Sequence, residues 1–128
     1  MIQVKKRENY SVVLKGHNDL QIISDVTAAQ GGDDVGLDPH EILEASLGAC
    51  TSITLAMYAK RKNWNLLDAE VEVKIEKEGT ESLLTRKIKL IGDLTEEQRQ
   101  GLLAVANKCP IHKLLTSRIE IQSTLVSP

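Results

Sequence analysis

The chain has 128 residues, and its 16 basic and 18 acidic side chains are interspersed, for a net charge of −2. This length is typical of one ordinary domain, which can bury a core without disulfides. No basic stripe or aromatic platform indicates a nucleic-acid partner, and no apolar run approaches the ~20 residues of a membrane span. Because the chain has no Phe, one Trp and two Tyr, its core is expected to be aliphatic.

The N-terminal segment and the cysteines bear on the compartment. Residues 1–10 are charged and lack the apolar core of a signal peptide, so a cytoplasmic location is expected. In a reducing cytoplasm, Cys50 and Cys109 are not expected to form a structural disulfide. They are then packing residues, metal ligands or redox groups.

The first third of the chain predicts short strands and a loop. Segments 2–6, 10–15 and 20–24 alternate, and residues 16–19 read as a turn, which predicts a small antiparallel meander. Residues 30–36 hold three Gly and two Asp and are expected to form a loop with close backbone approaches. No Gly-Lys-Ser/Thr follows, so this is not a phosphate loop.

A long helix follows the loop. Asp38 is a capping residue, Pro39 fits the first helical position, and Glu41 completes a capping-box pattern. The helix is expected to end near Lys62. Its first two-thirds are almost uncharged, and a helix that is apolar nearly all round must be covered on several sides. We therefore expect burial of this helix in a dimer.

The second half of the chain predicts a hairpin and further short elements. Segment 70–76 alternates strictly and is expected to pair with 86–91. Thr95 and Gln98 form a second capping box for a helix that is expected to reach about Lys108. A short helical turn over 111–115 and a strand over 118–125 complete an α+β layer structure within one domain, residues 1–128.

The two cysteines gain meaning as a pair. Both are expected on helices that cover the sheet, so they can meet despite their separation in the sequence. A thiolate that attacks a peroxide becomes a sulfenic acid, which a second thiol resolves as a disulfide. The attacking sulfur needs a lowered pKa, and Cys50 lies too deep in its helix for the helix dipole to provide it. A cation from elsewhere in the fold or from a partner subunit must do so.

Two other interpretations of these residues stay open at this point. Free cysteine is often a small buried hydrophobic residue, so each sulfur alone is as well explained by packing. Cys50, Cys109, His112 and His40 are four candidate zinc ligands, although the usual short paired spacings are absent. We expect no metal and no cofactor.

The chain resembles the OsmC/Ohr family, the osmotically inducible and organic hydroperoxide resistance proteins. The resemblance covers nearly the whole chain and is carried by residues 36–51, by residues 93–98 and by Cys109-Pro-Ile-His112. It implies an intertwined homodimer with sheets around a long central helix. It also implies a cysteine-based hydroperoxide reductase, with Cys50 as peroxidatic and Cys109 as resolving residue and a cellular dithiol as reductant.

The chain departs from the family pattern in its charged residues. The family peroxidases carry a carboxylate ten residues before the first cysteine, where this chain has His40, and Glu41 is expected on the opposite side of the helix from Cys50. The family's activating Arg before the long helix is also absent. Arg7 is the upstream candidate for that role. Arg61 and Arg86 are possible substitutes, and His112 and His40 are candidates for proton transfer.

These departures keep a second function open. A non-catalytic member of the same fold would bind a small hydrophobic or thiol-reactive ligand at the dimer interface, or would sense oxidants there.

Overall fold

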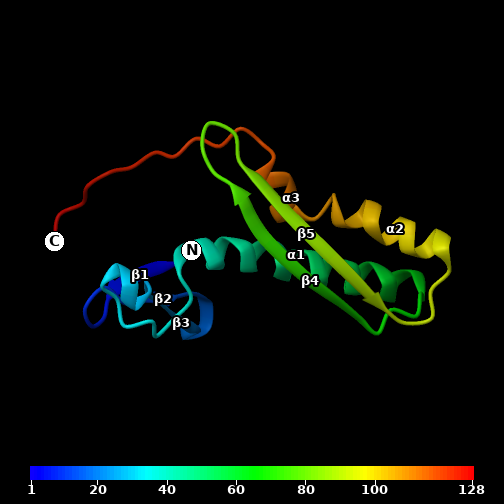
Figure 1. The fold of residues 1–128 in the computed structure, drawn as a ribbon, viewed down its shortest axis with the longest axis horizontal. Helices are drawn as coiled ribbons and strands as arrows, with labels where there is room; N and C mark the ends of the chain where they lie inside the picture. The colour runs from blue at the N-terminus through cyan, green and yellow to red at the C-terminus, as the bar shows by residue number, and fades with distance from the viewer. The chain divides into compact units, whose positions relative to one another are not determined.

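The computed structural model describes residues 1–128, which form two compact units, residues 1–45 and 46–128. The chain is α+β, as the sequence predicts, with two small antiparallel sheets and one long helix (Figure 1). In chain order the elements are β1 (Gln3–Lys6), β2 (Val12–Lys15), η1 (His17–Asp19), β3 (Gln21–Ser24), η2 (Ala28–Gln30), α1 (Pro39–Lys62), β4 (Asp68–Lys77), β5 (Leu83–Ile91), α2 (Glu96–Ala106) and α3 (Pro110–Leu115). That all of them form one domain stays a prediction.

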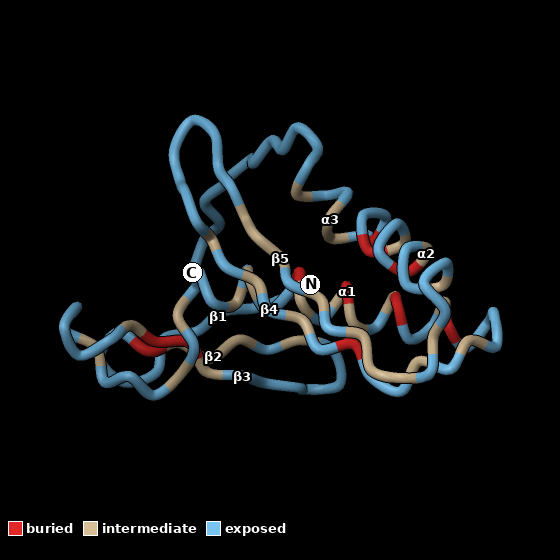
Figure 2. Tube along the Cα trace, turned by 45° about the vertical axis from the view of Figure 1, so that its right-hand side comes forward, coloured by how far each residue is buried: buried red, intermediate tan, exposed pale blue.

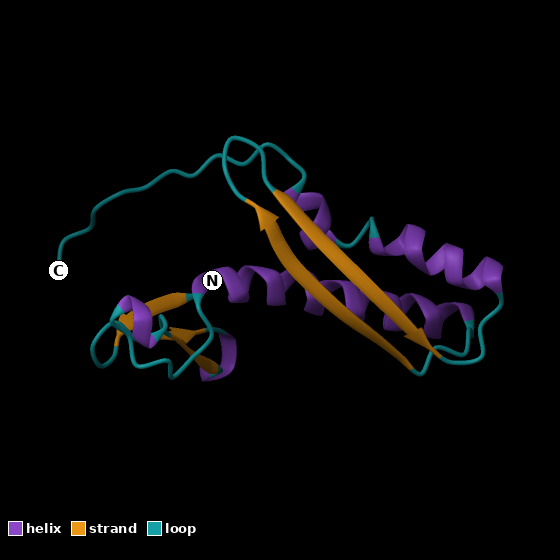
Figure 3. Ribbon diagram, in the orientation of Figure 1, coloured by secondary structure: helices purple, strands orange, loops and turns teal.

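The first unit holds the predicted meander. Strands β1, β2 and β3 pair in sequence order and antiparallel (Figure 3). The predicted turn after β2 is a 3₁₀ turn in which Asn18 and Asp19 have φ of 52° and 58°. Asn and Asp adopt this left-handed conformation more easily than other non-glycine residues, so the turn chemistry is present in the sequence.

The loop before α1 closes around one buried carboxylate. Asp25 Oδ1 accepts from the backbone N–H of Val26 at 2.7 Å, and Oδ2 accepts from Asp33 and Val35 at 3.1 and 3.3 Å. A side chain at Gly32 would collide with the backbone of Val26. The loop is therefore an ordered structural feature of the first unit.

Loss of the Asp25 carboxylate is expected to destabilise this unit. Burial raises the pKa of Asp25, but the three backbone N–H groups and the charge of Arg7 lower it overall. A depressed carboxyl pKa contributes stability that is present above the unfolded pKa and lost as pH falls through the folded one. We expect Asp25→Asn to lower the melting temperature at pH 7, and this difference to shrink below about pH 4. Thermal unfolding of both proteins from pH 7 to pH 3 measures it. A difference that does not change with pH would contradict the prediction.

The start of α1 confirms the predicted cap. The backbone N–H of Glu41 donates to Asp38 Oδ1 at 2.8 Å, and Glu41 Oε1 accepts from the N–H of Asp38 at 3.0 Å. Pro39 occupies the first helical position, where its missing N–H costs nothing. The carboxylate of Glu41 therefore acts as a helix cap.

The second unit has a small aliphatic core (Figure 2). It joins one face of the β4–β5 hairpin to α2 and to the C-terminal half of α1. Its buried members are Leu55, Ala59, Ala69, Leu102 and Ala106, with partly buried aliphatic and aromatic residues around them. Burial of these side chains is the main force that holds the hairpin against the helices.

The two faces of the hairpin differ in polarity. On β5 the residues Leu84, Ile88 and Leu90 are partly buried, while Lys87 and Lys89 between them are exposed. Arg86 lies on the apolar face, opposite Val73 of β4. A guanidinium on the face that packs against helices requires polar partners there.

The helices of the C-terminal half start where the sequence predicts them. Thr95 and Gln98 form a reciprocal capping box at the start of α2. The helix ends at Ala106, slightly before the predicted end near Lys108. Cys109 is the N-cap residue of α3, and Pro110 holds its first helical position.

The predicted strand over 118–125 is wrong for the single chain. Residues 118–128 pair with no strand, and Ile119 and Ile121 are 53% and 84% exposed. Their alternating pattern is that of a strand with one apolar face, but this segment pairs with neither sheet of the chain.

The expectation that no apolar run approaches a membrane span also needs correction. An 18-residue window of α1 has a mean hydropathy of 1.3, and by length and composition this helix could cross a membrane. One such helix is weak evidence, because the central core helix of a soluble protein has the same composition. Leu55 and Ala59 of α1 are indeed buried in the core of the second unit.

Candidate active site

The fold of the second unit brings the two cysteines together. Cys50 lies on α1 and is partly exposed, whereas Cys109 lies between α2 and α3 and is fully buried. Cys50 lies near enough to Cys109 for its thiol to lower the pKa of the Cys109 thiol. The structure contains no cluster of three or more His, Cys, Asp or Glu side chains that could hold a metal ion.

Arg86 is the cation beside this pair. Its Nη1 lies 4.0 Å from Cys109 Sγ and donates to Thr51 Oγ1 at 3.0 Å. Its Nη2 donates to Asn107 Oδ1 at 2.9 Å and to His112 Nδ1 at 3.2 Å. Arg86 extends from β5, and hydrogen bonds to α1, to the C-cap of α2 and to α3 hold its guanidinium beside the Cys109 sulfur.

No carboxylate neutralises the charge of Arg86. All of its hydrogen-bond acceptors in the protein are neutral groups, apart from Cys109 when that thiol is ionised. A guanidinium only donates, so His112 Nδ1 accepts and the neutral ring carries its proton on Nε2. A thiolate at Cys109 is the one anion that this arrangement offers to the guanidinium.

The surroundings of Cys109 favour its ionised form. Burial raises the pKa of the Cys109 thiol, because the charged form loses hydration. Four groups nevertheless lower this pKa overall, in decreasing order the backbone N–H of His112, the hydroxyl of Thr51, the thiol of Cys50 and the charge of Arg86. That Cys50 is the ionised sulfur stays a prediction, and the cation Arg86 lies beside Cys109.

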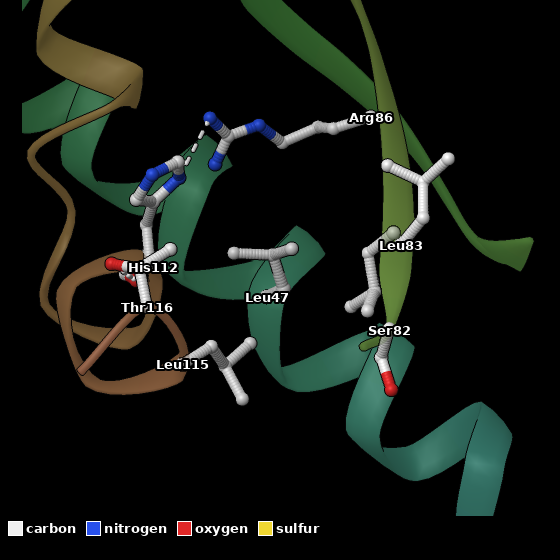
Figure 4. A pocket seen from close by; sticks show the side chains of 8 residues that line it. Leu47, Ser82, Leu83, Arg86, His112, Leu115 and Thr116 are labelled. Atoms are coloured by element: carbon white, nitrogen blue, oxygen red, sulfur yellow. Dashed lines mark hydrogen bonds between the residues drawn. The ribbon is translucent and has the colours of Figure 1, made fainter. Parts of the chain in front are cut away.

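A cavity of about 280 Å³ lies next to the cation (Figure 4). Arg86 and His112 form its polar end, and they are joined by the hydrogen bond that Figure 4 shows as a dashed line. The remaining lining is mostly aliphatic and is made by Leu47, Leu83, Leu84 and Leu115, together with Ser82 and Thr116. Such a cavity suits a ligand that has one polar and one apolar end.

The predicted assisting residues fall into different surroundings. Only His112 contacts the Arg86 group of the second unit. His40, Glu41 and Arg7 belong to the first unit, where Glu41 caps α1 and Arg7 donates to Ser11 Oγ at 3.4 Å. The alternative cation Arg61 lies over the ring of Tyr58, 5.3 Å from its centre.

Sequence reasoning named Arg86 only as a substitute and missed Thr51 and Asn107 as its partners. A signal for Arg86 was present, because in the alternation Arg86, Ile88, Leu90 it occupies an apolar-face position while Lys87 and Lys89 take the wet face. A charge at such a position indicates a functional or paired group. No comparable signal marked Asn107, which lies after the last residue of α2.

Comparison with known proteins agrees with this fold. No curated protein matches the chain in sequence. An OsmC-like protein from Mycoplasma pneumoniae has a TM-score of 0.73 at 19% identity, over 90% of this chain and 85% of that chain. The organic hydroperoxide resistance protein OsmC from Legionella pneumophila gives 0.62 at 16% identity, over 91% and 89% of the two chains. OhrB of Bacillus subtilis gives 0.58 at 24% identity, over 91% and 90%. These structures share the fold.

The family assignment comes from the sequence match. The family model for OsmC-like protein matches residues 31–124, a range that contains both cysteines and Arg86. The chain therefore belongs to the OsmC-like protein family.

Proposed function

We propose that this protein is a cysteine-based peroxidase that reduces organic hydroperoxides in the cytoplasm. The observation that carries the proposal is that two cysteines lie near each other, with the Arg86 guanidinium, which no carboxylate neutralises, 4.0 Å from the Cys109 sulfur. Family membership and the fold shared with organic hydroperoxide resistance proteins support a role with peroxides.

The thiol pair can supply an attacking thiolate at Cys50. The Cys109 thiol has a lowered pKa and is the sulfur that ionises. Its thiolate accepts the proton of the nearby Cys50 thiol, which leaves the charge on the partly exposed Cys50, where a peroxide can reach it.

The reaction balances with two thiols and one peroxide. Cys50 thiolate attacks the terminal peroxide oxygen, an S–O bond forms, the O–O bond breaks, and the leaving alkoxide takes the Cys109 proton to become the alcohol. The resulting Cys109 thiolate then attacks the sulfur of the Cys50 sulfenic acid, whose hydroxyl takes a proton from solvent and leaves as water, and the Cys50–Cys109 disulfide forms. A cellular dithiol returns two electrons to the pair and is itself oxidised.

The cavity beside Arg86 favours an organic substrate over hydrogen peroxide. Its aliphatic lining offers contact to the alkyl or aryl group of a hydroperoxide, while Arg86 and His112 offer polar contacts at one end. Hydrogen peroxide has no apolar group to bury there and gains nothing from this lining.

Thiol counting tests the proposal directly. Reduced protein is mixed with stoichiometric cumene hydroperoxide, and free thiols, disulfides and alcohol are measured over time. We expect rapid loss of two thiols per chain, a Cys50–Cys109 bond and one alcohol per chain. Thiols that disappear no faster than those of free cysteine would contradict the proposal and favour ligand binding in the cavity.

We also propose that the protein works as a homodimer. An apolar stripe on α1 is uncovered in the single chain, with Ile53 59% and Met57 68% exposed. Ala49 and Ala56 extend this stripe at helical spacing and are exposed as well. A second copy of the same helix would cover it, and residues 118–125 could find their sheet edge on that copy.

The dimer has its own test in the mass of the particle in solution. One chain has a mass of 14.1 kDa, and light scattering is expected to give about twice this value. Ile53→Glu places a charge in the stripe and should shift the protein toward a single chain. The control is Leu67→Glu, at a side chain that is 74% exposed outside the stripe and should leave the mass unchanged. A wild-type mass of one chain would disprove the dimer.

A further inference from the structure

We propose that Arg86 serves the second sulfur of the pair: it holds Cys109 as the resolving thiolate and as the leaving group when the disulfide is reduced. The reductant then attacks Cys50. This inference rests on the proposed function, because it assumes a Cys50–Cys109 disulfide. It assigns Arg86 to the later steps of the cycle, whereas the family resemblance implies an Arg that activates the peroxidatic cysteine.

The contacts of Arg86 are one-sided. Its hydrogen bonds go to the Cys109 sulfur, to Thr51, to Asn107 and to His112, and none goes to Cys50. Cys50 instead contacts Thr54 Oγ1 at 3.9 Å on its own helix. The guanidinium therefore distinguishes the two sulfurs by position, although they lie next to each other.

The two cysteines also differ in burial, and this difference agrees with the position of Arg86. Cys109 has no exposed surface, while Cys50 is partly exposed. In the single chain, a dithiol that approaches the disulfide reaches the Cys50 sulfur, because Cys109 is covered. Thiol–disulfide exchange is faster when the sulfur that leaves is the more stable thiolate, and its rate also depends on access to the attacked sulfur. Both conditions select Cys50 for attack and Cys109 for departure.

The electrons can be followed through the reduction. A reductant thiolate attacks the Cys50 sulfur and forms a mixed disulfide, and the Cys50–Cys109 bond breaks with its electron pair on Cys109. The new thiolate lies beside Arg86 and needs no proton. The second reductant thiol, as thiolate, then attacks the reductant's own sulfur of the mixed disulfide. This releases Cys50 as a thiolate, which takes up a proton, and leaves the reductant as a disulfide.

The test begins with protein that diamide has oxidised, so it needs no peroxide activity. Arg86→Met removes the charge, Arg86→Lys keeps it, and Lys87→Met is the matched control on the exposed face of the same strand. Reduction by dithiothreitol is followed by thiol counting. We expect Arg86→Met to slow reduction about 3- to 10-fold and to move the equilibrium about tenfold toward the disulfide for each unit by which the pKa of Cys109 rises. Arg86→Lys should recover part of both effects, and Lys87→Met should behave as wild type.

The attacked sulfur is identified by trapping. Oxidised wild-type protein is treated with limiting glutathione, quenched with N-ethylmaleimide and mapped by mass. The inference expects glutathione on Cys50 and maleimide on Cys109, and ultraviolet titration of the thiolate should show a raised pKa of Cys109 in Arg86→Met.

Two results would overturn the inference. Glutathione found mainly on Cys109 would reverse the polarity of the disulfide. Wild-type reduction kinetics and equilibrium in a folded Arg86→Met protein would remove the arginine from these steps. Neither result depends on whether the reduced protein reacts with cumene hydroperoxide, so failure of the proposed function is seen separately.

Discussion

A Cys109→Ser protein is expected to reduce one equivalent of cumene hydroperoxide per chain and then to stop. Cys50 keeps its partly exposed sulfur in this variant, so sulfenic acid still forms, but no second sulfur is present to condense with it. Steady-state turnover with a dithiol should fall by about 10²-fold or more, because the reductant must then act on the sulfenic acid directly. Trapping with dimedone and mass analysis detects the sulfenic acid on Cys50.

The matched variant is Cys50→Ser. It retains Cys109 beside Arg86, but that sulfur is buried, and the variant should lose no thiol faster than free cysteine does. The pair of variants separates the roles of the two cysteines, since each keeps one sulfur. Rapid sulfenic acid formation on Cys109 in Cys50→Ser would reverse the assignment and make the residue beside Arg86 the peroxidatic one.

Much of the fold could be predicted because its signals are local. The box between Asp38 and Glu41 and the box between Thr95 and Gln98 are short-range hydrogen-bond patterns, and both helices begin where these patterns stand. The strict alternation of residues 70–76 likewise predicted β4. Such signals need no knowledge of the rest of the chain.

The strand predicted over 118–125 shows the limit of local reasoning. Alternation indicates a conformation that suits a sheet, but a strand also needs an edge with free N–H and C=O groups. In the single chain residues 118–125 pair with none of the edges of the two sheets. The expectation that a second copy covers the long apolar helix stays a prediction, and Ile53 and Met57 are exposed in the single chain.

The candidate site could also be predicted only in part, because the position of its cation depends on how distant segments pack. Two cysteines far apart in the sequence were expected to come near each other, and Cys50 lies near enough to Cys109 to lower its pKa. The cation that accompanies them comes from β5, and its placement depends on the hairpin register that sets Arg86 opposite Val73. The family resemblance implied an arginine before the long helix, and Arg7 was the candidate for it. In the structure, Arg7 donates to Ser11, and its charge acts on Asp25 in the first unit.

Leu102→Ala is expected to destabilise the protein by about 2–5 kcal/mol, a large effect for a single truncation. Leu102 has no exposed surface and lies in the core cluster where α2 meets α1 and the hairpin. Truncation removes buried apolar surface and leaves a cavity that the aliphatic surroundings fill only in part. Urea unfolding followed by circular dichroism gives the change in the free energy of unfolding.

The neighbouring residue supplies the control. Leu103 lies on the same helix but is 48% exposed, so Leu103→Ala removes the same atoms from a surface position. It should cost less than about 1 kcal/mol, because little buried surface is lost. The contrast also bears on the site, since α2 leads directly to Asn107 and Cys109. If α2 packs less firmly, Asn107 and Cys109 are positioned less precisely beside Arg86. We therefore expect Leu102→Ala to slow disulfide reduction even under conditions where the protein is still folded. Equal losses of stability in the two variants would contradict the prediction, because they would show that Leu102 contributes no more to the core than the exposed Leu103 does.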